Sequence, residues 1–224
     1  MAAIRVISLD LDDTLWPVGP VIAAAEQALI DWLRSRYPAA AHGHDVSSMR
    51  AMRSRVAEEF PERSHDLTFL RHRALTAQFA AAGLPAGLSD EALEVFLHAR
   101  NRVEFYDDVR PALDRLRSRY RLFALSNGNA DLHRCGIGNL FDGHVTAIAA
   151  GAAKPDARIY AALIRMAGVS AAEILHVGDD PHADVDGARQ AGMQTIWLNR
   201  GGEREWPGEL APPARTISTL DEIS

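Results

Sequence analysis

The chain of 224 residues contains one cysteine, Cys135, and one lysine, Lys154. A single cysteine can form neither an intrachain disulfide nor a cysteine-based zinc site, which favours a reducing compartment. The sequence also lacks N-glycosylation triplets, and its apolar runs are too short for a signal-peptide core or a membrane span. We therefore expect a cytoplasmic protein that does not engage a membrane.

An excess of positive charge is also absent. The formal net charge at pH 7 is −6, so the chain lacks the excess of positive charge with which proteins bind a nucleic-acid backbone. Hydrophobic residues make up 47% and charged residues 24%, a composition that argues against a disordered chain or a disulfide scaffold. The length predicts one domain with a sizeable insertion, or two small domains.

Short apolar runs rich in β-formers alternate with helical patterns at the start of the chain and in its second half. Strands are expected at 4–9, 120–125, 173–177 and 194–198, with a weaker one around 144–149, and helices at 107–119, 156–167 and 183–191. Apolar runs that barely alternate are typical of strands covered on both faces. The pattern predicts a doubly wound parallel α/β sheet, in which chemistry gathers at the carboxyl ends of the strands.

One connection between expected strands is too long for a simple crossover, because more than a hundred residues separate Asp10 from Ser126. Helical patterns at 21–37, 46–59, 65–82 and 89–104 fill this stretch. We therefore predict an α/β core of residues 1–15 and 106–224 and an inserted helical bundle at 16–105. The bundle either adds apolar core or serves as a lid, and its place directly after an active-site strand favours the lid.

Acidic side chains crowd the end of the first strand in Asp10-Leu11-Asp12-Asp13-Thr14. Carboxylates held together repel one another, which costs stability unless a cation or hydrogen bonds offset it. The second core strand ends in Leu125-Ser126-Asn127-Gly128-Asn129, where a hydroxyl and backbone N–H groups could approach a phosphate. Either segment alone could also be an ordinary turn.

Lys154 is notable because the other 23 basic residues are arginine. Its ammonium is a compact point charge that fits a crowded anionic site, whereas guanidinium is a wide planar fork. The alternative is a solvated surface lysine placed by chance. The context favours a site, because a further strand ends in Gly178-Asp179-Asp180, with Asp184 one turn later. Two acidic strand ends side by side would form an oxygen site suited to Mg²⁺.

In order and spacing, Asp10/Asp12, Ser126, Lys154 and Asp179/Asp180 resemble the four motifs of the haloacid dehalogenase (HAD) superfamily. The resemblance covers the core, and the insertion resembles the helical C1-type cap of that superfamily. It implies a HAD-type core fold and a Mg²⁺-dependent phosphomonoester hydrolase that acts on a small phosphorylated metabolite.

The resemblance also implies catalytic roles. Asp10 would be the nucleophile that forms an aspartyl-phosphate, and Asp12 would protonate the leaving group and then activate water. Mg²⁺ would be held by the carboxylates of Asp10 and Asp179 and by the backbone carbonyl of Asp12. Ser126 and the backbone amide of Asn127 would hold phosphate oxygens. Lys154 would be a catalytic and substrate-binding residue that bridges Asp10 and the phosphoryl group. Supporting roles would fall to Asp180 and Asp184, which would orient the metal's waters or Lys154, and to Thr14, which would steady the loop.

A narrower resemblance extends over most of the chain, including the insertion. The segments 9–16, 20–22, 65–71, 126–129 and 175–180 are similar to bacterial cytoplasmic HAD phosphatases that act on FMN and on 5-amino-6-(5-phospho-D-ribitylamino)uracil. Sugar phosphates or phosphoglycolate are the alternative substrates. Five residues are candidates for specificity, although each taken alone is more simply explained as a packed or solvated residue of the insertion: Trp16, His65, Asp66, Arg71 and His72.

Three other functions compete with this interpretation. The dehalogenases of the superfamily lack the second carboxylate of the first motif, so Asp12 favours phosphate chemistry. A phospho-receiver domain is much shorter and has no inserted cap. A silent binding module is disfavoured because all the expected acids and the lysine are present. The sequence leaves the oligomeric state open.

Overall fold

The computed structural model describes residues 2–202 and 204–223. The chain divides into two compact units. The core unit comprises residues 1–17, 104–128 and 136–224, and the helical unit comprises residues 18–103 and 129–135. The sequence predicted the inserted bundle at 16–105, whereas the structure also groups residues 129–135 with the helices. The use of the helical unit as a lid stays a prediction.

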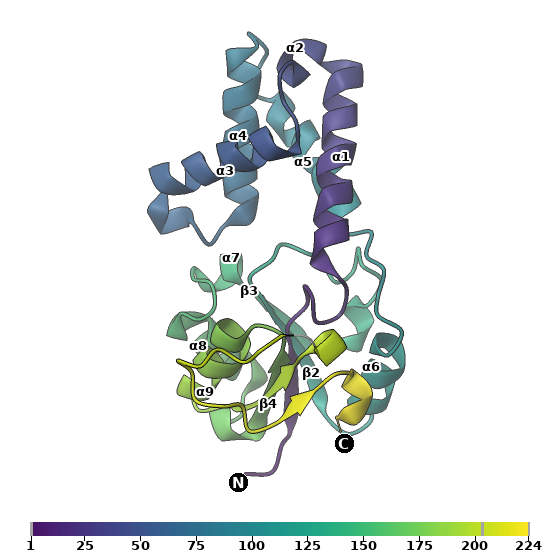
Figure 1. The fold of residues 1–224 in the computed structure, drawn as a ribbon, viewed down its shortest axis with the longest axis vertical. Helices are drawn as coiled ribbons and strands as arrows, with labels where there is room; N and C mark the ends of the chain where they lie inside the picture. The colour runs from purple at the N-terminus through teal and green to yellow at the C-terminus, as the bar shows by residue number, and fades with distance from the viewer. Residues whose placement is uncertain (1, 203, 224) are drawn as a thin grey trace. The chain divides into compact units, whose positions relative to one another are not determined.

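A parallel sheet forms the centre of the core unit (Figure 1). Within the described residues its strand order is β3-β2-β1-β4-β5-β6. The strands are β1 (Val6–Leu9), β2 (Arg121–Ser126), β3 (Gly143–Thr146), β4 (Ile174–Gly178), β5 (Gln194–Leu198) and β6 (Thr216–Ile217). All neighbouring strands pair in parallel. The predicted doubly wound α/β class is therefore confirmed.

Two details at the edges of the sheet differ from the prediction. The weak run around 144–149 is a strand only to Thr146, because the Thr146 side chain accepts a hydrogen bond from the amide of Ala149 and begins α7 (Ala147–Ala150). The edge strand β6 has two residues, too few for a period of two to be visible in the sequence.

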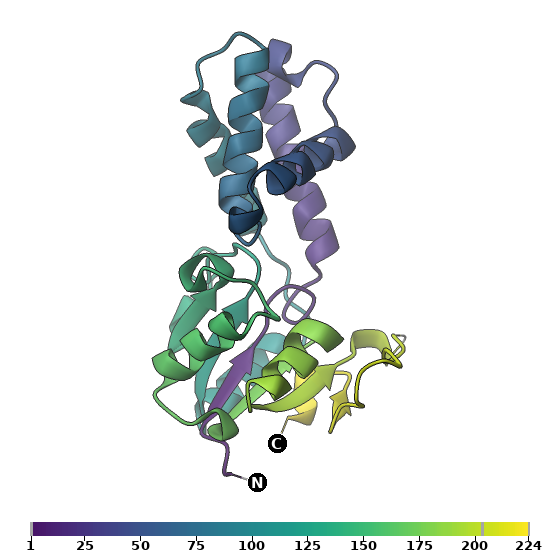
Figure 2. The same ribbon diagram turned by 90° about the vertical axis from the view of Figure 1, so that its left-hand side faces the viewer.

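Helices cover both faces of the sheet (Figures 1 and 2). One side carries α8 (Ala157–Ala167) and α9 (Gly187–Gln190), and the other carries α6 (Val109–Arg117). The predicted helix at 183–191 is split into a π-helical stretch, Pro181–Asp186, and α9. The apolar layer on the α8 side includes Val6, Phe123, Leu125, Val145, Ile159, Leu163 and Ile174, all almost fully buried.

The strand register places the expected site segments together. In β1, Leu9 lies opposite Ala124 of β2 on one side and Val177 of β4 on the other. The next residue after Leu9 is Asp10, and the carboxyl ends of β2 and β4 lie beside it. Because β1 lies between β2 and β4, the segments that follow all three strands can contribute residues to a site at this edge.

The helical unit consists of α1 (Val18–Arg36), α2 (Pro38–Ala41), α3 (Val46–Glu59), α4 (Leu67–Ala81) and α5 (Leu88–Arg100). Asp45 and Ser48 form a capping box at the start of α3. The apolar core of the helical unit contains, among others, Leu29, Leu33, Leu75, Phe79 and Phe96. Among the described residues, no helix has both the length and the apolar character needed to cross a bilayer.

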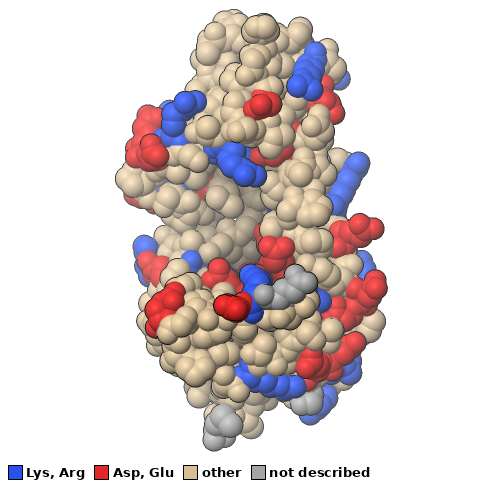
Figure 3. Space-filling view, in the orientation of Figure 1, with Lys and Arg blue, Asp and Glu red and all other residues tan. Residues whose placement is uncertain are grey.

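Charged side chains of both signs are interspersed on the face of the molecule shown in Figure 3. The same mixture is seen in the ion pairs within each unit, such as Arg134 with Glu94 in the helical unit and Arg158 with Asp156 in the core unit. Exposed pairs of this kind contribute little to stability.

Candidate active site

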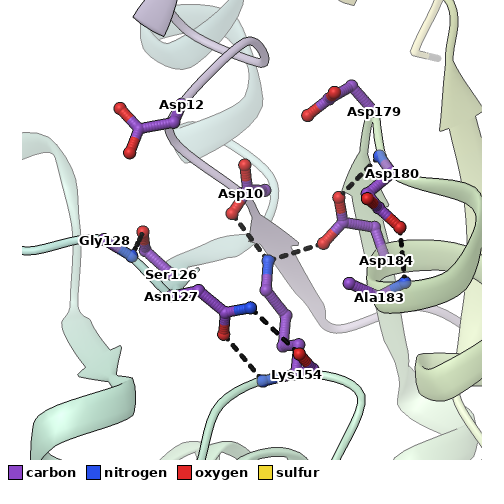
Figure 4. A pocket seen from close by; sticks show the side chains of 10 residues that line it. All are labelled: Asp10, Asp12, Ser126, Asn127, Gly128, Lys154, Asp179, Asp180, Ala183 and Asp184. Atoms are coloured by element: carbon purple, nitrogen blue, oxygen red, sulfur yellow. Dashed lines mark hydrogen bonds and ion pairs between the residues drawn. The ribbon is translucent and has the colours of Figure 1, made fainter. Parts of the chain in front are cut away.

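A pocket at the carboxyl edge of the sheet gathers the predicted site residues of the core unit except Thr14, which does not line it (Figure 4). It is lined by Asp10, Asp12, Ser126, Asn127, Gly128, Lys154, Asp179, Asp180, Ala183 and Asp184. These residues come from four chain segments that are far apart in the sequence. The sequence motifs therefore converge in space, although their catalytic roles stay predictions.

Lys154 lies at the centre of this pocket and is only 6% exposed. Its ammonium donates to Asp10 Oδ1 at 2.6 Å, to Asp184 Oδ1 at 2.6 Å and to the carbonyl oxygen of Leu125 at 2.9 Å. These three acceptors use all three donors of an ammonium. Burial disfavours the charge, but Asp10 and Asp184 together outweigh burial and hold the pKa of Lys154 above its ordinary value.

Asp184 is buried and binds groups on three sides. It accepts from Lys154, from the backbone N–H of Asp180 at 2.9 Å and from His176 Nε2 at 3.1 Å. Burial acts against its charge, yet Lys154 and His176 hold its pKa below the ordinary value. A Cβ at Gly178 would lie 2.3 Å from Asp184 Cγ, so only glycine allows this close approach.

His176 was not predicted as part of the site. It is fully buried on β4, and burial lowers its pKa, so the imidazole is neutral. The carboxylate of Asp184 can only accept, so the hydrogen-bond network assigns the ring proton of His176 to Nε2. The other ring nitrogen, Nδ1, then accepts from the Ser8 hydroxyl at 3.0 Å. His176 therefore fixes the orientation of Asp184, which in turn fixes Lys154.

Carboxylates outnumber cations in the pocket. Ligand oxygens of Asp10, Asp179 and Asp184, all buried, lie within 4.8 Å of one another. Burial raises the pKa of Asp10 well above its ordinary value, with Asp184 and Asp179 adding to the rise and Lys154 opposing it. Burial also raises the pKa of Asp179 to about 6. A set of hard oxygen donors with unbalanced negative charge fits Mg²⁺.

Three further residues surround Asp179. Thr14, predicted to steady the first loop, donates its hydroxyl to Asp179 Oδ1 at 3.2 Å. Trp197 donates its indole N–H to the backbone carbonyl of Asp179 at 2.9 Å. Arg204 donates to Asp179 Oδ2 at 2.7 Å from a side chain that is 49% exposed. Neither Trp197 nor Arg204 was predicted as part of the site. Arg204 places a positive charge beside Asp179, the carboxylate that the sequence predicts as a metal ligand.

Ser126 and Asn127 lie at the end of β2. The Ser126 hydroxyl accepts from the backbone N–H of Gly128 at 2.9 Å. The Asn127 side chain accepts from the backbone N–H of Lys154 at 2.7 Å and donates to its carbonyl oxygen at 3.0 Å. The side chain of Asn127 thus anchors the loop that carries Lys154, a contact that the sequence did not indicate. Its predicted backbone role toward a phosphate stays a prediction.

Asp12 lies on the far side of Asp10 from Asp184, and its carboxylate is turned away from Lys154 (Figure 4). Oδ1 of Asp12 accepts from the indole N–H of Trp16 at 2.8 Å. Asp12 is partly buried, whereas Trp16 is fully buried in the core unit. Of the two roles considered for Trp16 from the sequence, the structure therefore supports the packed residue, because no face of the ring is accessible to a substrate.

Asp180 has a local structural role. Its side chain caps the π-helical stretch by accepting from the backbone N–H groups of His182 at 2.8 Å and Ala183 at 2.7 Å. These bonds fix the turn that brings Asp184 back to Lys154. A role of Asp180 toward metal-bound water stays a prediction.

The other specificity candidates lie in the helical unit. Asp66 is the N-cap of α4 and accepts from the amide of Phe69 at 2.8 Å. Arg71 is buried, donates to Glu26 at 3.0 Å and lies 3.3 Å from the ring centre of Phe96. These contacts occupy Asp66 and Arg71 within the unit. His72 lies 2.9 Å from Asp90, and His65 is partly buried.

Two similarities to proteins of known name complement this geometry. The chain is 32% identical over 223 residues to the 5-amino-6-(5-phospho-D-ribitylamino)uracil phosphatase YigB of Escherichia coli, covering 95% of this chain and 92% of that protein. It is also 32% identical over 159 residues to the phosphoserine phosphatase of Thermus thermophilus, covering 68% of this chain and 63% of that protein. The expectation of a hydrolase that acts on phosphate monoesters is confirmed by these relatives.

A solved structure is similar along nearly the whole chain. It is described as a 2-haloacid dehalogenase from Pseudomonas syringae pv. Tomato, with 38% identity and a TM-score of 0.90, covering 97% of this chain and 95% of that one. The model of the haloacid dehalogenase-like hydrolases matches residues 4–192. The match spans both sides of the insertion and every segment of the pocket, and so the chain belongs to the haloacid dehalogenase-like hydrolase family.

Proposed function

We propose that this protein hydrolyses a small phosphate monoester in two steps, with Asp10 as the covalent nucleophile and Asp12 as the general acid and base. The observation that carries the proposal is the position of Asp10 at the end of the central strand. There its carboxylate lies 2.6 Å from the only ammonium of a lysine in the chain, and Asp12 lines the same pocket.

In the first step, a carboxylate oxygen of Asp10 attacks phosphorus and the bond from phosphorus to the ester oxygen breaks. The leaving alkoxide takes a proton from Asp12. In the second step, water attacks the phosphorus of the aspartyl-phosphate and gives a proton to Asp12, which releases Asp10 and inorganic phosphate. Lys154 supports both steps by holding Asp10 in place and adding positive charge beside the phosphoryl group.

The residues of the pocket also fit a bound Mg²⁺. Asp10, Asp179 and the backbone carbonyl of Asp12 would hold it, with the buried Asp184 close to the first two carboxylates. When bound, the cation supplies two positive charges that allow a carboxylate to approach a phosphate dianion. Burial first, and neighbouring carboxylates second, raise the pKa values of Asp10 and Asp179, and a bound cation would offset both effects.

For the substrate we propose FMN or 5-amino-6-(5-phospho-D-ribitylamino)uracil, with sugar phosphates and phosphoglycolate as alternatives. The support is the identity to the Escherichia coli phosphatase over 95% of the chain, which includes the helical unit. That unit would act as the cap that selects the substrate. The lone cysteine supports a cytoplasmic location.

The test is a screen of phosphorylated metabolites with Mg²⁺, followed by Asp10→Asn. We expect turnover of at least one phosphate monoester by the natural chain and none by Asp10→Asn, with folding intact by circular dichroism. Acid quenching during turnover of a ³²P-labelled substrate should trap label on the natural chain only. Hydrolysis by Asp10→Asn at the natural rate would contradict the covalent route.

Dehalogenation of 2-haloacids is a second candidate, favoured by the similarity to the Pseudomonas syringae structure. There a carboxylate oxygen of Asp10 would displace halide from carbon, and water would hydrolyse the resulting ester. A halide leaves without a proton, so this reaction does not need Asp12. Asp12→Asn therefore separates the two: loss of phosphate release indicates a phosphatase, whereas unchanged chloride release from 2-chloropropionate indicates a dehalogenase.

A further inference from the structure

Trp16 is held rigidly at the end of the loop that carries Asp10 and Asp12. It is fully buried, and its ring packs edge-on against Phe105 at 5.7 Å between ring centres. Its carbonyl oxygen accepts from the backbone N–H of Asp13 at 2.8 Å, and a β-bridge joins the backbones of Asp12 and Trp16. The indole therefore has no freedom to follow a moving partner.

The indole N–H points at one specific group, Oδ1 of Asp12, at 2.8 Å. An indole donates a hydrogen bond but cannot accept one, so it orients a carboxylate without competing for the proton that the carboxylate exchanges. A fully buried donor also has no water to bond with, so a lost partner would leave the N–H unsatisfied. Both properties favour one fixed orientation of Asp12.

We infer that Trp16 is a positioning residue for Asp12, which it holds by its indole N–H in the orientation needed to exchange a proton with the leaving group and with water. The inference rests on the proposed function, because it assumes the acid–base role of Asp12. Proton transfer depends steeply on geometry, so a carboxylate that rotates freely spends much of its time out of reach.

The experiment compares Trp16→Phe with the natural chain in single turnovers with enzyme in excess, so that only the first step is measured. A leaving group that needs a proton, as in glycerol 3-phosphate or the best alkyl phosphate from the screen, should lose roughly 10- to 100-fold in rate, the range for a hydrogen bond to a charged group. p-Nitrophenyl phosphate, whose leaving group needs no proton, should change less than about threefold. Equal losses for both substrates would overturn the inference.

Two controls separate positioning from packing. Phe105→Leu disturbs the packing of the Trp16 ring but keeps the N–H, and it should not change the ratio of the two rates. Replacement of Trp16 by β-(3-benzothienyl)alanine keeps the shape without the N–H, and it should reproduce the Trp16→Phe pattern even if Trp16→Phe itself folds poorly. Normal alkyl phosphate turnover by the isostere would refute the role of the N–H.

A double-mutant cycle with Asp12→Asn completes the test. Adding Trp16→Phe to Asp12→Asn should cause no further loss of rate on the alkyl phosphate, because the positioned group is already gone. Multiplied losses would indicate a structural role and overturn the inference while leaving the proposed function intact. Natural activity of Asp12→Asn alone would instead remove the acid–base role of Asp12, and this inference with it.

Discussion

Replacement of Asp179 by asparagine should stabilise the protein when no metal is present. Burial raises the pKa of Asp179 to about 6 from an ordinary value of 3.8, although Arg204 opposes the rise. Two pKa units correspond to about 3 kcal/mol, which is the cost of keeping this carboxylate charged in the folded protein above pH 6. Asparagine has the same shape without the charge. It loses one of the two bonds from Thr14 and Arg204, so about 3 kcal/mol is an upper limit.

The sign of the pH dependence follows from the direction of the shift. Because the pKa of Asp179 is higher in the folded chain than in the unfolded chain, its cost is absent below about pH 4 and fully present above about pH 6. The difference in melting temperature between Asp179→Asn and the natural chain should therefore grow across this window. It should level off at no more than roughly 10 °C, from about 2–4 °C per kcal/mol for a chain of this size.

The assay is thermal unfolding of both proteins in chelator from pH 4 to pH 8, followed by a Mg²⁺ titration at pH 7.5. Mg²⁺ should raise the melting temperature of the natural chain more than that of Asp179→Asn. Asp156→Asn is a control of opposite sign, because bonds from Arg158 lower the pKa of the exposed Asp156 to about 2 and its charge is stabilising. A metal-free Asp179→Asn no more stable than the natural chain at pH 7.5 would refute the reasoning.

Two more predictions concern the cations of the pocket. Lys154→Arg should lower kcat by roughly 100-fold or more despite the conserved charge, because a planar guanidinium does not fit three acceptors arranged around one nitrogen. The surface substitution Arg158→Lys is the matched control, and normal turnover by Lys154→Arg would contradict the argument. Arg204→Ala should tighten Mg²⁺ binding, measured by calorimetry, up to about fivefold, because the partly exposed guanidinium competes with Mg²⁺ for Asp179. Arg165→Ala, which removes an exposed charge elsewhere, should have no effect, and weaker Mg²⁺ binding by Arg204→Ala would contradict the prediction.

The features that the sequence predicted correctly depend on local patterns. The four main core strands are read from short apolar runs, and the polar residues that end them are adjacent in the chain. The parallel topology then brings these polar residues together, since it places the carboxyl ends of neighbouring strands at one edge of the sheet. Asp10, Ser126 and Asp179 could therefore be expected near one another without knowledge of any side-chain conformation.

The features that it missed depend on side-chain directions set by the tertiary fold. Arg204 reaches Asp179 from a loop 25 residues away, and no period or motif marks such a contact. His176 faces Asp184 only because β4 and the following turn present both to one side of the sheet. Asp66 is a different case, because an acid just before a helical run is an N-cap signal that the sequence already contained.

The same imbalance of charge underlies the sequence motifs and the energetics of the pocket. A protein selected for stability alone would have apolar residues in place of Asp10 and Asp179, since even a well-paired buried carboxylate brings little net stability. Here Lys154 is shared between Asp10 and Asp184, and among the described residues the Asp179 carboxylate accepts from a half-exposed arginine and a threonine. The remaining negative charge lowers the stability of the metal-free fold. The Mg²⁺ that we propose to bind there would offset this charge, so stability in Mg²⁺ and in chelator, rather than turnover alone, gives the more direct measure of what these acids do.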